Sequence, residues 1–229
     1  MGRQGQQRTS GRIVGALILL GYVAYIAGSG LLDSGVGTAV PSDLVANQLQ
    51  ISAGALLMLI NSAAVVSIGV LVLPVLRPHH EVSAYAYLIT RVFEAVMLAV
   101  GILCLLLLIP LGQQYVDAGA GNLPSLARVA QETQFYSYQI AMLGLGLGSI
   151  LFCRALFRTR LVPRFMAVWG MAGYAIFAAG AALEVLGYGV GLALSVPGGL
   201  FEIALAGLLI AKGFGHPIVD RVQANSSMV

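Results

Sequence analysis

Six long apolar stretches, separated by short polar connections, dominate the pattern of hydrophobic and polar residues along this chain. Each contains roughly 20 or more residues, the length of helix that crosses a hydrocarbon core of ~30 Å. The pattern therefore predicts an all-α fold, a polytopic bundle of six transmembrane helices. We expect these helices at residues 12–32, 51–76, 83–110, 134–157, 163–187 and 191–214.

Two connections are longer than the others. In residues 33–50, Ser42 and Asp43 are of the types that begin helices, which indicates a brief surface turn before the second span. Residues 111–133 are rich in Gly and Ala and then weakly amphipathic, with Asn122 or Ser125 able to cap a short helix. The alternatives there are a helix lying on the outer leaflet and a plain connector, and the composition favours the connector.

The composition excludes a soluble domain. Hydrophobic residues make up 59% of the chain, charged residues 9%, and the mean hydropathy is +0.90, whereas soluble domains carry about 25% charged residues. We divide the chain into a cytoplasmic tail at 1–11, a transmembrane domain at 12–214 and a second cytoplasmic tail at 215–229.

Basic residues are distributed unequally between the two sides of the predicted bundle. Arg128 alone falls on one side and Arg91 lies within a span, while the remaining ten of the twelve fall on the side of the N-terminus. Cytoplasmic connections are enriched in Lys and Arg, so both termini are predicted to be cytoplasmic. This distribution accounts for the pI near 9.0 without a nucleic-acid partner. The ten residues are Arg3, Arg8, Arg12, Arg77, Arg154, Arg158, Arg160, Arg164, Lys212 and Arg221.

A few polar residues interrupt the apolar spans. At 1.5 Å per residue, Arg91, Glu94 and Glu202 lie about 12, 16 and 15 Å from the inner face, and Asn61 falls near the middle of the second span. Ionisable groups at such depths mark substrate or proton pathways unless they only join helices. We expect Arg91 to pair with Glu94 or Glu202 and the remaining acid to carry a proton. These four residues are the candidate ligand-binding or charge cluster.

Two further groups of residues suggest contacts outside such a cluster. Arg158, Arg160 and Arg164 lie at the predicted inner surface and are candidates for binding anionic lipid head groups. Small-residue faces around Gly144, Gly148 and Gly180 allow close helix packing, within the bundle or with a partner helix. No catalytic, cofactor-binding or metal-binding motif is recognisable in the sequence.

Several segments resemble an uncharacterised bacterial multi-pass family, the domain of unknown function 4386. The resemblance covers roughly residues 12–214 and rests on "RVFEAV", "FRTRLVPRFMAVWGMAGYAIF" and "FEIALAGLLIAKGF". Where relatives often read "FGLH", this chain has "LGLG" at 145–148, so it lacks that histidine. The resemblance implies a six-helix protein of the bacterial inner membrane and supplies no activity. The matching positions are Arg77, Pro78, Arg91, Glu94, Arg158, Pro163, Arg164, Gly173, Tyr174, Glu202, Lys212 and Gly213.

Three functions remain open on the sequence alone. The first, which the sequence favours, is an accessory or assembly subunit of a membrane complex, whose charges only join its helices. The second is a protein that binds or transports a small molecule or lipid through the Arg/Glu cluster. The third and least favoured is a membrane-embedded enzyme using Glu94 or Glu202 as a general acid or base.

Overall fold

The computed structural model describes residues 3–37, 41–118 and 123–215. These residues are almost entirely helical and contain no strand, which confirms the predicted all-α class. Among them, six helical stretches are long and apolar enough to cross a membrane. The helices are α1 (Arg3–Val36), α2 (Pro41–Ala46), α3 (Gln48–Leu76), α4 (Glu81–Leu106), α5 (Leu108–Ala118), α6 (Leu123–Thr159), α7 (Arg164–Val185) and α8 (Gly191–Lys212).

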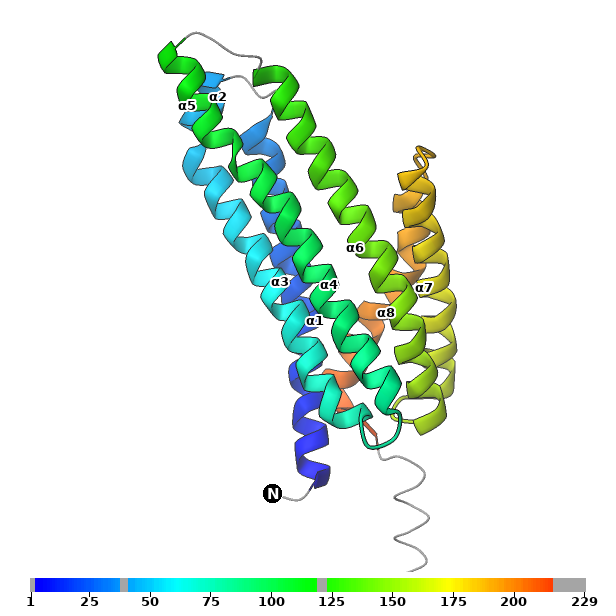
Figure 1. Ribbon diagram of the computed structural model, residues 1–229. Coiled ribbons are helices and arrows are strands. Elements are labelled where there is room, and N and C mark those ends of the chain that lie inside the picture. Colours follow the sequence, from blue (N-terminus) through cyan, green and yellow to red (C-terminus); the bar gives the residue numbers. More distant parts are fainter. Residues whose placement is uncertain (1–2, 38–40, 119–122, 216–229) are drawn as a thin grey trace, which may run out of the picture.

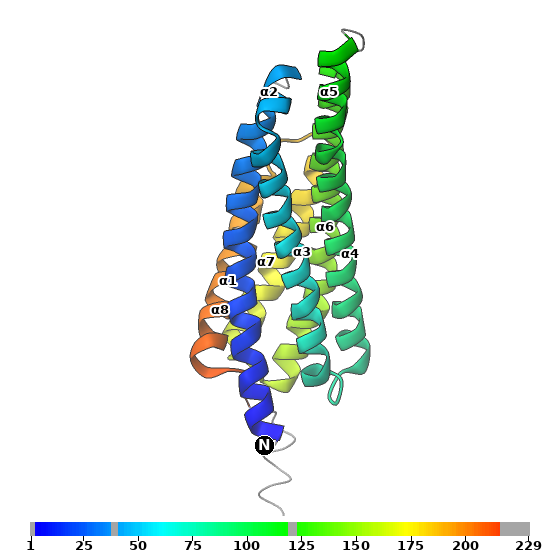
Figure 2. The ribbon, with the colours of Figure 1, turned by 90° about the vertical axis from the view of Figure 1, so that its left-hand side faces the viewer.

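The six long helices form a closed ring. Each packs against the next one along the chain, and α8 packs against α1 to complete the circuit. Successive long helices run in opposite directions, so α1 begins and α8 ends at the same end of the bundle (Figures 1 and 2). Because the ring is closed by neighbouring pairs, its centre is bounded by all six helices.

Glycine occurs at every one of the six contacts in this ring. Two glycines face each other where Gly28 of α1 meets Gly54 of α3, and a Cβ on Gly28 would lie 2.9 Å from the Gly54 carbonyl oxygen. Small residues let backbones approach closely, and lipid-embedded helices associate through such packing. The predicted packing role of Gly144, Gly148 and Gly180 is confirmed within the bundle. Glycines contact neighbours at Gly28–Gly54, Gly69–Arg91, Gly144–Phe93, Gly148–Thr90, Gly146–Ala178, Gly180–Leu194, Gly173–Gly198 and Gly15–Ala206.

The end of the bundle opposite the termini has a hydrophobic core of its own. Buried side chains from α1, α2, α3, α4, α5 and α6 meet there, including Leu44, Leu108 and Ala127, each with an exposed fraction of 0%. Here α1, α3 and α6 extend beyond α7 and α8 (Figure 1). The interpretation of 111–133 as a plain connector was wrong, because the described part of it is helical. Burial of one face in this second core stabilises helix beyond the apolar spans.

Helix α1 also begins earlier than the first predicted span. It starts at Arg3, whereas the apolar stretch begins at residue 12. Gln and Arg are good helix formers, so the polar residues continue the same helix outside the hydrocarbon layer. The brief turn expected near Ser42 and Asp43 is present as α2.

The positive-inside pattern predicts that the end with the termini faces the cytoplasm. Cysteines introduced singly at Glu81 and at Asp117, both exposed and at opposite ends, should react with an impermeant thiol reagent from opposite sides of the membrane. The native thiols, buried Cys153 and partly buried Cys104, are removed in this background. Reaction of both new cysteines from one side would contradict the topology.

Candidate functional site

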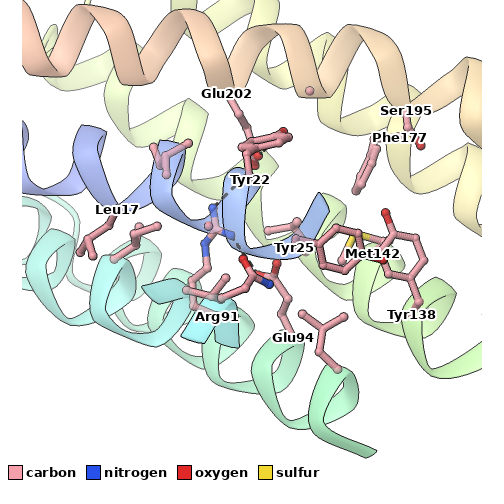
Figure 3. A pocket seen from close by; sticks show the side chains of 18 of the residues that line it. Leu17, Tyr22, Tyr25, Arg91, Glu94, Tyr138, Met142, Phe177, Ser195 and Glu202 are labelled. Atoms are coloured by element: carbon pink, nitrogen blue, oxygen red, sulfur yellow. Dashed lines mark hydrogen bonds and ion pairs between the residues drawn. The ribbon is translucent and has the colours of Figure 1, made fainter. Parts of the chain in front are cut away.

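A cavity of about 300 Å³ lies at the centre of the ring. All six long helices contribute to its wall, which is mainly apolar and carries a polar group at one end (Figure 3). This volume is at the lower end of the range for small-molecule sites, about 300–1,000 Å³. The lining residues are Leu17, Ile18, Gly21, Tyr22, Tyr25, Asn61, Val65, Ile68, Arg91, Glu94, Leu98, Tyr138, Met142, Leu145, Phe177, Ser195, Val196, Gly199 and Glu202.

Arg91 of α4 is the centre of the polar group. Its Nη1 donates to Glu94 Oε2 at 2.9 Å, its Nε donates to the Tyr87 hydroxyl at 3.0 Å, and its Nη2 lies 3.7 Å from Glu202 Oε1. Arg91 is 5% exposed and Glu94 is 4% exposed. A three-residue spacing places Arg91 and Glu94 on one face of the helix, so α4 supplies an ion pair already formed within a single helix.

Glu202 of α8 accepts hydrogen bonds on both carboxylate oxygens. The Tyr22 hydroxyl of α1 donates to Oε2 at 2.8 Å, and the Tyr174 hydroxyl of α7 donates to Oε1 at 2.5 Å. Together with the Arg91 contact, this carboxylate joins α1, α4, α7 and α8. Buried tyrosines require a partner for the hydroxyl, and here both find the same one.

Two polar groups face the cavity without a protein partner. The side-chain amide of Asn61 is 8% exposed and makes no hydrogen bond among the described residues, and Glu94 Oε1 accepts none there either. Gly21 of α1 leaves room for the amide, since a Cβ at that position would lie 2.8 Å from Asn61 Oδ1. Water or a bound molecule can supply the hydrogen bonds that the protein does not give these two groups.

The other end of the cavity is aromatic. Tyr25 of α1 stacks on Tyr138 of α6 with ring centroids 5.7 Å apart. Phe177 of α7 also lines the cavity, near Ser195 (Figure 3). Figure 3 shows these rings beside Met142, displaced from the Arg91 and Glu94 side chains along the bundle. The cavity therefore has a charged end and an aromatic end.

The structure brings all four residues of the predicted cluster to one cavity. Arg91 contacts both acids, whereas the sequence predicted a contact with one of them, and Asn61 lines the same space. Their functional role stays a prediction. The lipid head-group candidates Arg158, Arg160 and Arg164 are elsewhere, exposed at the connection between α6 and α7. Their role also stays a prediction.

Sequence reasoning missed the tyrosines of this site. Tyr22 and Tyr174 hold Glu202, and Tyr25 and Tyr138 form the aromatic end. Tyrosine in membrane proteins is enriched at the two interfaces, so a tyrosine near the middle of a span is the signal that could have identified them.

The polar and aromatic groups of the wall determine what contacts the cavity offers. Over the ranges that the structure describes, no group of three His, Cys, Asp or Glu side chains lies close enough to hold a metal ion. The cavity offers one carboxylate oxygen, one amide and several aromatic faces to a guest. These groups provide orientation through hydrogen bonds and charge, while the apolar wall provides contact area.

A family model matches nearly the whole transmembrane region. The model for domain of unknown function DUF4386 matches residues 13–213. Comparison with curated proteins gave no match, and comparison with solved structures gave none.

Proposed function

The chain belongs to the DUF4386 family of multi-pass membrane proteins, a domain of unknown function, and we propose from its geometry that it binds a small molecule in the central cavity. The observation that carries this proposal is the cavity of about 300 Å³ bounded by all six spanning helices. The side chains around such a volume have fewer packing contacts than in a filled interior, and a bound molecule would supply them.

Unpartnered polar groups in the wall support binding over a purely structural role. If Arg91, Glu94 and Glu202 only joined helices, nothing would require Glu94 Oε1 and the Asn61 amide to face a cavity without a partner. A bound molecule that hydrogen-bonds at these positions supplies partners that the described residues do not. The accessory-subunit interpretation stays a prediction, as does the location in a bacterial inner membrane. No described feature favours the enzyme.

Filling the cavity tests this proposal. Gly199 of α8 lines the cavity, and a Cβ there would meet only the Tyr22 hydroxyl, at 3.5 Å, an ordinary contact distance. Gly199→Leu should therefore fold and place its side chain in the cavity. Native mass spectrometry of the full chain from mild detergent should show a small bound molecule in the wild type, lost in Gly199→Leu.

A matched control lies on the same helix. Gly207 is exposed, and a Cβ on it would have no atom within 4 Å, so Gly207→Leu should retain the bound molecule. The proposal fails if the wild type carries no small molecule, or if Gly199→Leu retains the same mass as Gly207→Leu.

A further inference from the structure

We propose that the ligand class is a small organic cation, an ammonium group on an apolar body. This inference rests on the proposed function, since it specifies the chemistry of the molecule in the same cavity. Three features of the cavity wall lead to it: its charge, the pairing of Arg91 with acids, and the placement of the aromatic rings.

The charge of the wall is the first feature. Among the lining residues only Arg91, Glu94 and Glu202 are ionisable at neutral pH, which gives two carboxylates and one guanidinium. If both acids are ionised the cavity carries a surplus negative charge, and an uncompensated buried charge is costly. A proton or a bound cation removes that cost, whereas a bound anion increases it.

The pairing of Arg91 with acids is the second feature. Its three nitrogens face oxygens of Tyr87, Glu94 and Glu202, although some of the five N–H groups of the guanidinium make no hydrogen bond among the described residues. A carboxylate or phosphate ligand on those N–H groups would lie beside two carboxylates, which repel it. Arg91 is therefore already paired with negative charge, unlike the guanidinium of an anion site.

Glu94 is, by contrast, open on one side. Its Oε2 is held by Arg91, while Oε1 accepts no hydrogen bond from the described residues and borders the cavity together with Asn61. Glu202 has no such open oxygen, because Tyr22 and Tyr174 occupy both. The ammonium group is thus expected beside the Glu94 carboxylate, with the partial negative charge of the Asn61 carbonyl oxygen next to it.

The aromatic rings are the third feature. Tyr25, Tyr138 and Phe177 line the cavity beyond the charged end, and their faces attract organic cations by cation–π interaction. An inorganic cation would require several oxygen ligands in place of these rings. An ammonium group with an apolar body satisfies Glu94 and the aromatic wall together.

Three probes of nearly equal size and different charge test separately whether the cavity binds a small molecule and whether that molecule is a cation. Phenyltrimethylammonium is the cation, tert-butylbenzene its neutral counterpart, and benzenesulfonate the anion. Binding of each to the full chain in lipid nanodiscs is measured by competition against the others, with Gly199→Leu subtracted as background. We expect the cation to bind at least about tenfold more tightly than the neutral probe, with no binding of the anion.

Glu94→Gln keeps the hydrogen bond from Arg91 and removes the negative charge. It should reduce binding of the cation roughly tenfold and leave the neutral probe unchanged. Glu132→Gln, on an exposed part of α6, is the control and should change neither. A second variant, Tyr138→Leu, should weaken the cation more than the neutral probe, compared with the exposed Tyr136→Leu.

The outcomes are distinct. If no probe binds the wild type above the Gly199→Leu background, the proposed function fails. If the neutral probe or the anion binds as tightly as the cation, the cavity binds ligands but the organic-cation class is wrong. Equal loss of the cation and the neutral probe in Glu94→Gln would also overturn the class, because it would show a general effect on the cavity.

Discussion

Arg91→Leu is expected to lower the free energy of unfolding by about 3–5 kcal/mol, since removal of one partner strands buried charge. Glu94, which is 4% exposed, would lose its one hydrogen-bond donor among the described residues, and Glu202 would lose its nearby cation. Arg91 also donates to Tyr87, so two contacts within α4 and one contact with α8 are lost together. The measurement is equilibrium or thermal unfolding of the full chain in detergent.

The two partners of Arg91 should respond differently in double mutants. Glu94 lies 2.9 Å from Arg91 and has no other donor in the described part of the chain, while Glu202 lies 3.7 Å away and keeps hydrogen bonds from Tyr22 and Tyr174. Arg91→Leu combined with Glu94→Gln should therefore recover more stability than Arg91→Leu combined with Glu202→Gln. We expect a coupling energy of about 0.5–3 kcal/mol in the first double-mutant cycle.

An exposed Arg–Glu pair in the same chain provides the matched control. Arg77 and Glu81 form an ion pair at 3.3 Å with side chains 58% and 62% exposed, and such pairs contribute about 0–1 kcal/mol. Arg77→Leu should thus have a small effect. If the Arg91 and Glu94 substitutions are simply additive, as expected for Arg77 and Glu81, the buried cluster does not contribute as described.

Gly28→Ile is expected to cost 3 kcal/mol or more, roughly the upper range for overpacking in a core. A Cβ at Gly28 would lie 2.8 Å from Met58 Cγ and 2.9 Å from the Gly54 carbonyl oxygen. The backbone of α3 cannot retreat without opening the contact with α1 along its length. The loss of stability should be measurable as a lower unfolding temperature of the full chain in mild detergent.

The control for this change is two residues away on the same helix. A Cβ at Gly30 would have no atom within 4 Å, so Gly30→Ile should be neutral, or stabilising by a few tenths of a kcal/mol through helix propensity. Equal loss in both variants would show that the effect comes from the residue type and not from the contact between α1 and α3.

The spans were predictable from the sequence because lipid demands long apolar helices. The residues at which the helices begin and end were not predictable, because a helix continues beyond its apolar span where one of its faces is still buried against other helices. Ala127 and Ala130 are buried in the second core, yet the polar residues around them are typical of a connector. That core forms where several helices meet, and the hydrophobic pattern of a single segment does not indicate which other segments it will contact.

The candidate site was predictable in part for a related reason. A charge in a membrane span is rare and costly, so Arg91, Glu94 and Glu202 stand out in the sequence. Tyrosines do not, because an aromatic ring in an apolar helix is equally typical of a core or a lipid-facing surface. The cavity exists only because the ring closes between α1 and α8, and that closure is a property of the tertiary structure.

The binding cavity is tested most directly by locating a bound probe. Crystals of the full chain grown with a bromine-substituted phenyltrimethylammonium can be measured for the anomalous signal of bromine. The account predicts one bromine site inside the ring, among Tyr25, Tyr138 and Phe177, and none there in Gly199→Leu. Bromine found only on the lipid-facing surface of the helices, or inside the ring equally in Gly199→Leu, would contradict it.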